Sequence, residues 1–145
     1  MKQLSPSLED YLEAAYALRL SDGIVRASTV SRRLKVSKPS VNSAMKALAA
    51  RGLLAQELYG HIVLSPPGLK AGEEIAGRHR LLKDFFISIL GVPEGSAEHD
   101  ACKAEHALSP GAIKRLESLT SFLKAPARAR TLAAARAAIR GGAPR

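Results

Sequence analysis

Residues Ser28 to Gly52, STVSRRLKVSKPSVNSAMKALAARG, contain the clearest indication of the fold class. Residues 28–34 form one short amphipathic segment, and residues 35–37 can make a tight turn. Pro39 then fits the first position of a second helix, where its missing N–H costs nothing. Gly52 ends this second helix. The stretch therefore predicts a helix-turn-helix.

The second helix of this pair has the composition of a helix that reads DNA. Its apolar residues recur at helical spacing from Val41 to Leu48 and predict a buried stripe. The outward side chains are small, polar or cationic, as insertion into a major groove requires. We expect base contacts from Ser37, Pro39, Ser40, Asn42 and Ser43, and phosphate contacts from Arg26, Arg32, Arg33, Lys38 and Lys46.

Flanking segments complete a winged unit. A helix is expected from Ser7, as N-cap, to about Leu20, and residues 24–26 read as a short extended piece. Residues 53–58 and 61–64 predict two strands joined at Tyr59-Gly60, with Tyr59 at the tip of a DNA-contacting wing. Such a hairpin can also serve only to cover the core.

The second half of the chain is expected to be helical. One helix is predicted from Leu69 to about Leu90, one from Ser96 to Ala107, and one from Ser109 with apolar residues 113, 116, 119, 122 and 123 on one face. So many apolar faces in so few residues predict a core that is completed by dimerisation. The expected domains are 1–68, 69–126 and a basic Ala/Arg-rich helix and tail at 127–145, disordered from Gly141.

Composition narrows the class of partner. The chain has 145 residues, 46% of them hydrophobic, and no apolar run reaches the roughly 18 residues that span a bilayer. With no signal sequence and one cysteine, we expect a cytoplasmic protein without a disulfide and without membrane association. The net charge of +9 points to a polyanion, nucleic acid first and an acidic membrane surface second.

The segment Asp100-Ala101-Cys102-Lys103-Ala104-Glu105-His106 carries metal-ligand chemistry. On a helix, Cys102, Glu105 and His106 stand at i, i+3 and i+4 and converge on one face. A thiolate, a carboxylate and an imidazole suit iron, cobalt, nickel or zinc better than calcium or magnesium. Three donors rarely close a shell.

Further donors are weak candidates when taken alone. Asp10 and Glu13 lie one turn apart on the first expected helix, where helix-dipole complementarity and exposure explain acidic residues equally well. His79 lies in the middle of the long helix, and a lone histidine is more often a surface residue than a ligand.

Five segments together resemble a known family of metal-dependent repressors, typified by the diphtheria toxin repressor and the manganese transport regulator. The resemblance covers about residues 5–124. The matching segments are Leu8-Glu9-Asp10-Tyr11-Leu12-Glu13, Val36-Ser37-Lys38-Pro39-Ser40-Val41, Tyr59-Gly60-His61-Ile62-Val63-Leu64, Arg78-His79 and Asp100 through Ser109.

The resemblance implies a mainly α protein: a winged helix-turn-helix followed by a helical metal-binding and dimerisation domain, without the SH3-like domain of longer members. It implies a homodimeric repressor of metal homeostasis genes that binds a palindromic double-stranded DNA operator when metal is bound. The implied ligands are Asp10, Glu13, His79, Cys102, Glu105 and His106.

The choice of metal stays open at this point. Asp10 with Glu13 resembles the manganese branch of the family, whereas Cys102 resembles the iron branch. Mn(II) and Fe(II) are therefore both candidates, with Zn(II), Co(II) or Ni(II) possible in vitro, and six donors could hold one ion or two. Lys83 stands where the family often has glutamate, which argues against an ancillary site of the iron-branch type.

Two rival functions can be weighed. The protein could be a winged-helix regulator that responds to an organic ligand, or one that binds DNA regardless of metal. In either case the Cys102, Glu105 and His106 cluster would be vestigial. A metalloenzyme is disfavoured because the chain has neither a His-Glu-x-x-His helix nor a glycine-rich phosphate loop. We therefore expect no enzyme, no catalytic residue and no organic substrate.

Overall fold

The computed structural model describes residues 4–142. These residues divide into two compact units, the first ending at Ala76 and the second beginning at Gly77. Within the described part of the chain, none of the helices combines the length and apolar character needed to cross a membrane.

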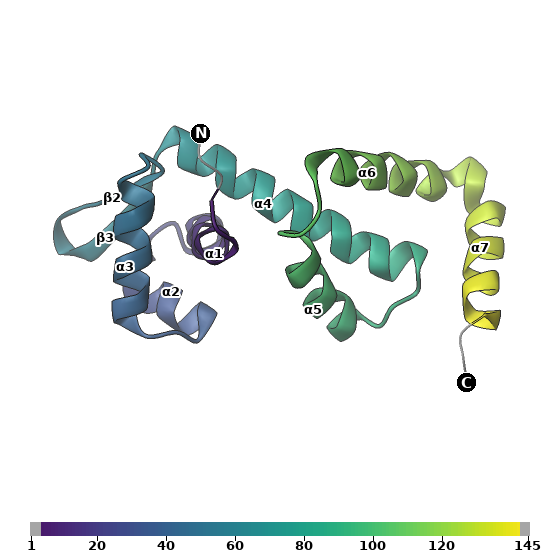
Figure 1. The fold of residues 1–145 in the computed structure, drawn as a ribbon, viewed down its shortest axis with the longest axis horizontal. Helices are drawn as coiled ribbons and strands as arrows, with labels where there is room; N and C mark the ends of the chain where they lie inside the picture. Colours follow the sequence, from purple (N-terminus) through teal and green to yellow (C-terminus); the bar gives the residue numbers. More distant parts are fainter. Residues whose placement is uncertain (1–3, 143–145) are drawn as a thin grey trace. The chain divides into compact units, whose positions relative to one another are not determined.

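The first unit contains the predicted helix-turn-helix. Helix α1 spans Pro6–Asp22, α2 spans Ala27–Leu34 and α3 spans Lys38–Ala49 (Figure 1). Ser37 caps α3, because its side chain accepts a hydrogen bond from the Ser40 amide at 3.3 Å. The expected cap of α1 was wrong. Ser5, not Ser7, takes the extended conformation and accepts from the Leu8 amide, so that Pro6 falls in the first turn.

A small antiparallel sheet forms the wing. Strands β1 (Val25–Arg26), β2 (Leu54–Gln56) and β3 (His61–Leu64) stand in the order β1-β3-β2. The tip is the turn η1 (Leu58–Gly60), in which Tyr59 adopts a left-handed conformation with φ of 71° and stays 96% exposed. The predicted strands therefore exist, although β2 is shorter than expected and the tip is a 3-10 turn.

One apolar core holds this unit together. The inner stripe predicted for α3 is confirmed, since Val41, Ala44, Met45 and Leu48 are all buried. Leu12 of α1 and Val30 of α2 pack into the same cluster and are fully buried. The core thus fixes α3 by its inner face and leaves its outer face to solvent.

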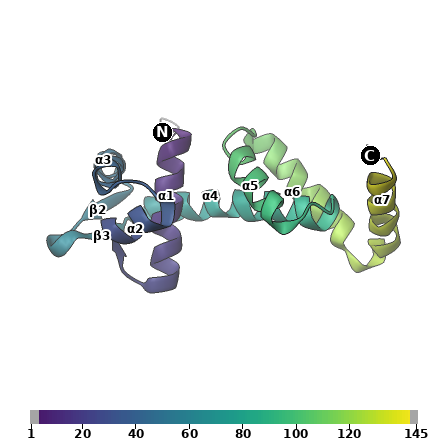
Figure 2. The same cartoon turned by 90° about the horizontal axis from the view of Figure 1, so that it is seen from below.

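The second unit is built from helices. Helix α4 spans Pro66–Asp84 and enters this unit at Gly77, then changes into the π-helical segment η2 (Phe85–Ile89) before Gly91, whose φ is 72°. The predicted helix to Leu90 is therefore not α-helical throughout. Helices α5 (Glu94–Ala104) and α6 (Pro110–Lys124) both pack on η2 (Figure 2).

The chain ends in a further helix. After the turn η3 (Pro126–Arg128), helix α7 spans Ala129–Gly141 and packs on α6 and η2. The Arg136 guanidinium donates to the Ile87 carbonyl at 3.4 Å, which ties α7 to η2. The expected basic helix is present, and its last residue, Gly141, is ordered in it, contrary to the expectation of disorder. Residues 143–145 of the expected tail lie outside the described residues.

The predicted apolar face of α6 is only partly covered. Leu119 and Phe122 are 45% and 50% exposed, whereas Thr120 is buried and donates its hydroxyl to the Leu116 carbonyl at 2.7 Å. The Arg128 guanidinium lies 4.6 Å from the centre of the Phe122 ring and shields part of it.

Candidate metal centre and DNA-binding surface

Glu105 is the centre of the polar cluster in the second unit. Its side chain is completely buried, although the residue lies just past the end of α5 as its C-cap. The amide of Glu105 donates to the Ala101 carbonyl at 3.0 Å, and the next turn is closed by the Ala107 amide donating to the Ala104 carbonyl at 3.0 Å. The expected helix to Ala107 was therefore too long: His106 stands in the turn after α5, not on its face.

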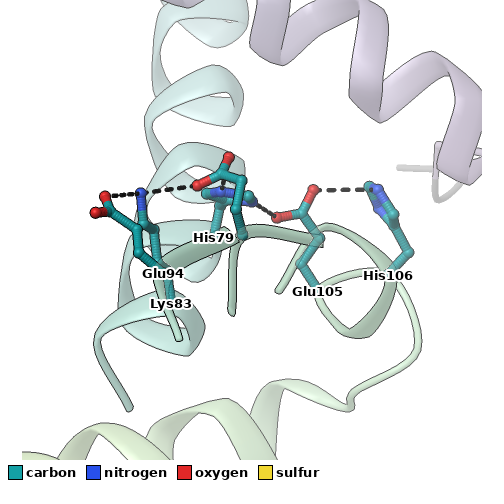
Figure 3. A network of polar contacts seen from close by, with 6 residues as sticks. His79, Lys83, Glu94, Glu105 and His106 are labelled. Atoms are coloured by element: carbon teal, nitrogen blue, oxygen red, sulfur yellow. Dashed lines mark hydrogen bonds and ion pairs between the residues drawn. The ribbon is translucent and has the colours of Figure 1, made fainter. Parts of the chain in front are cut away.

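Two histidines flank the Glu105 carboxylate (Figure 3). Oε2 lies 2.8 Å from His79 Nδ1, and Oε1 lies 3.2 Å from His106 Nε2. The second contact has ion-pair distance but not hydrogen-bond geometry, because Oε1 is buried without a hydrogen-bond partner among the described residues. A buried carboxylate oxygen in this state is costly, and a cation would remove the cost.

Sulfur is available beside this carboxylate. Cys102 is exposed on α5, and its Sγ lies within 4.8 Å of a Glu105 carboxylate oxygen. The second unit therefore gathers nitrogen and sulfur donors around one buried carboxylate. This donor set fits a borderline divalent transition metal.

A second carboxylate holds the other side of His79. Nε2 of His79 lies 3.0 Å from Glu98 Oε1, and Lys83 Nζ lies 2.9 Å from Glu98 Oε2. The same Lys83 ammonium group lies 3.2 Å from Glu94 Oε1 (Figure 3). The hydrogen bond from Lys83 lowers the pKa of Glu98, and the hydrogen bond to Glu98 raises the pKa of Lys83. Sequence reasoning missed Glu98. The available signal was its i, i+4 spacing from Glu94, which puts both carboxylates on one face of α5.

The remaining predicted ligands belong to the first unit. Asp10 and Glu13 stand one turn apart on α1, and both are half-buried. The preceding residue, Glu9, is 9% exposed. The second unit by itself brings together four of the six predicted ligands, which are His79, Cys102, Glu105 and His106.

The predicted DNA-contacting residues share one property, which is exposure. On and around α3 these are Arg26, Arg32, Arg33, Ser37, Lys38, Pro39, Ser40, Asn42, Ser43 and Lys46, and on the wing Tyr59. Three of them have local polar contacts: the hydroxyls of Ser37 and Ser40 are 2.8 Å apart, and the Arg26 guanidinium lies 3.3 Å from His61 Nε2. The exposed end of α3 thus presents hydroxyl groups and cations together.

Comparison with known proteins places both units. Residues 3–62 match the model for the iron dependent repressor N-terminal DNA binding domain, and residues 65–128 match the model for the iron dependent repressor metal binding and dimerisation domain. The HTH-type transcriptional regulator MntR of Geobacillus thermodenitrificans is 36% identical over 120 residues, covering 83% of this chain and 84% of the relative. Its counterpart in Listeria welshimeri is 34% identical over 120 residues with the same coverage.

Solved structures agree in fold. A manganese-dependent transcriptional repressor in complex with manganese has a TM-score of 0.72 at 27% identity, covering 79% of this chain and 53% of that one. ScaR with bound Zn²⁺ has a TM-score of 0.68 at 29% identity, covering 79% of this chain and 54% of that one. The present chain therefore spans about half the length of these structures.

A winged helix-turn-helix joined to a helical unit with transition-metal donors defines a metal-responsive DNA-binding regulator. The chain belongs to the iron-dependent repressor family. It is a metal-dependent DNA-binding transcriptional repressor, a class of protein that does not act as an enzyme.

Proposed function

We propose that Asp10, Glu13, His79, Cys102, Glu105 and His106 together hold a divalent transition metal, Mn(II) or Fe(II). The observation that carries this proposal is the buried Glu105 carboxylate, which has an imidazole beside each oxygen and whose Oε1 has no hydrogen bond from the described residues. Because a buried carboxylate requires a counter-charge, a cation bound in the cluster around Glu105 would be stabilised there.

Recruitment of the Asp10 and Glu13 carboxylates to the metal would couple this cluster to DNA binding. If Asp10 and Glu13 were brought close to Glu105, the three carboxylates would repel one another unless a positive charge lay among them. The bound cation supplies that charge. The carboxylates of α1 would then be drawn toward those of the second unit, which restricts the first unit to orientations that suit the operator.

The partner is proposed to be double-stranded DNA bound by a homodimer. Two copies of α3 would enter successive major grooves of a palindromic operator, with the hydroxyls and amide of α3 at base edges and the cations on phosphates. The half-exposed Leu119 and Phe122 of α6 provide apolar surface that a second copy would cover. We propose that the protein acts in the cytoplasm and that its targets are metal homeostasis genes.

The proposed ligands are compatible with two metals, Mn(II) and Fe(II). Thiolate sulfur at Cys102 favours iron or later metals, whereas carboxylates at Asp10 and Glu13 favour manganese. The relatives named MntR and the manganese complex favour Mn(II) as the first candidate.

The test uses fluorescence anisotropy of an operator duplex selected from random DNA, in Mn(II), Fe(II) or chelator. We expect metal to tighten DNA binding by wild type, Cys102→Ser to weaken this activation, and Asp10→Met to shift it toward Fe(II). Glu105→Gln should abolish activation, whereas Glu117→Gln, an exposed carboxylate on α6, should leave it intact. Equal affinity in chelator and in metal for all variants would favour the rival, a metal-independent regulator.

A further inference from the structure

The His79 ring is held at both nitrogens by carboxylates of the second unit. Nδ1 faces the buried Glu105 at 2.8 Å, and Nε2 faces Glu98 at 3.0 Å. An imidazole that binds a metal through one nitrogen carries its proton on the other. The carboxylate that accepts this proton therefore selects the ligating nitrogen and orients the ring.

We propose that Glu98 is a positioning residue for metal binding: it accepts the Nε2–H of His79 and so presents Nδ1 as the ligand atom. The inference rests on the proposed function, because it assumes that His79 is a ligand. The geometry assigns the roles of the two carboxylates. Glu105 is fully buried among the other donors, whereas the Glu98 side chain is 54% exposed, at the outer edge of the cluster.

Lys83 holds the Glu98 side chain in the conformation that faces His79. An exposed glutamate would sample several rotamers, but the ammonium group of Lys83 lies 2.9 Å from Glu98 Oε2 while Oε1 faces His79. Each carboxylate oxygen of Glu98 thus has its own partner. Since Lys83 also neutralises Glu98, this carboxylate carries a counter-charge from the chain itself and does not compete with Glu105 for the metal.

Glu94 provides a matched control. It lies on the same helix as Glu98, carries the same charge and also pairs with Lys83, at 3.2 Å, but its side chain is 78% exposed and the contact recorded for it in the described structure is with Lys83. A change at Glu94 therefore alters the net charge and the Lys83 pair. A change at Glu98 also removes the acceptor of the His79 ring.

The experiment is a Mn(II) titration of the full chain, with free Mn(II) counted by electron paramagnetic resonance. We expect Glu98→Ala to weaken Mn(II) binding roughly 10- to 100-fold, the usual effect of removing a partner of a ligating histidine. Glu94→Ala should weaken it about twofold or less, as for an exposed ion pair. Glu98→Gln should restore most of the affinity, because its amide oxygen can still accept the Nε2–H.

A second readout follows the proton itself. In ¹⁵N-histidine NMR of the Zn(II)-loaded chain, we expect His79 to be protonated at Nε2 in wild type and Glu98→Gln, and to show mixed tautomers in Glu98→Ala. Equal losses of affinity for Glu98→Ala and Glu94→Ala, or a proton on Nδ1 in wild type, would overturn the inference alone. Wild type that binds neither Mn(II) nor Zn(II) would overturn the proposed function as well.

Discussion

Gly72 of α4 lies directly against Tyr16 of α1: a Cβ added to Gly72 would stand 2.7 Å from the Tyr16 Cβ. Because neither backbone can easily withdraw within the packed first unit, the absence of a side chain at residue 72 permits this close approach. The same helix contains Gly77, where an added Cβ would meet nothing nearer than an Arg80 nitrogen at 3.9 Å.

These two glycines give opposite predictions for one substitution. Gly72→Ala should lower the free energy of unfolding by about 1–3 kcal/mol through overpacking. Gly77→Ala should raise it by up to about 1 kcal/mol, because alanine is the better helix former. Chemical denaturation followed by circular dichroism measures both. A stabilised Gly72→Ala variant would contradict the close packing of α1 on α4.

A second prediction concerns phosphate contacts by α3. Lys46→Ala should weaken binding to any duplex and should lower the slope of log K against log salt by about 0.9, the contribution of one neutralised phosphate. Lys70→Ala removes the same charge from an exposed position on α4 outside the proposed surface and serves as the control. Titrations at several salt concentrations separate the two variants. An identical slope for both variants would show that Lys46 does not contact a DNA phosphate.

A third prediction follows from an ion pair between α4 and α6. Lys124 Nζ lies 2.7 Å from Asp84 Oδ2, and the Ser88 hydroxyl donates to Oδ1 at 2.6 Å. Burial raises the pKa of Asp84, but the hydrogen bonds from Lys124 and Ser88 outweigh it, so that the pKa is lowered overall.

The lowered pKa means that the charged form of Asp84 stabilises the folded state. This contribution is complete above the ordinary aspartate pKa, about 3.9, and is lost as the pH falls through the lower folded value. Asp84→Asn should therefore destabilise the chain at pH 7, and the difference from wild type should vanish at strongly acidic pH. Since the pair is more than a third exposed, we expect at most about 1 kcal/mol. Denaturation at a series of pH values, with Lys124→Met completing a double-mutant cycle, measures it.

A fourth prediction addresses the exposed apolar side of α6. Leu119→Glu should shift the chain toward monomer in sedimentation velocity, because the charge would have to be buried in the proposed dimer. Ser121→Glu, at an exposed position on the same helix, should leave the distribution unchanged. Persistence of the dimer in Leu119→Glu would show that the subunits meet through a different surface.

Local signals explain what could be predicted from the sequence. Ser109 before Pro110 marks a helix start, and the structure confirms this cap. For α3 the expected start was wrong by one residue, because Ser37 caps the helix and Pro39 takes its second position, not its first. Ser5-Pro6-Ser7 offers two possible caps, and proline in the first turn selects the earlier one. Short-range rules were less accurate for two other helices, since α4 begins at Pro66 rather than Leu69 and α5 begins at Glu94 rather than Ser96.

The parts that escaped prediction depend on contacts between distant segments. The π-helical end of the long helix coincides with packing by α5, α6 and α7. His79 contacts Glu105, 26 residues away, and Glu98, 19 residues away. Both contacts form only when α4 and α5 pack together. Neither helical periodicity nor residue spacing along one element contains this information.

The position of Glu105 at a helix end has a practical consequence for engineering. Ala104 ends α5 and Ser109 caps α6, so the cluster's key carboxylate and His106 stand on a four-residue connection rather than on a rigid helix. One residue inserted between His106 and Ser109 would lengthen the connection beside Glu105 without replacing any proposed ligand. We therefore expect the length of this connection to affect metal affinity, so that affinity could be changed by design while every ligand is kept.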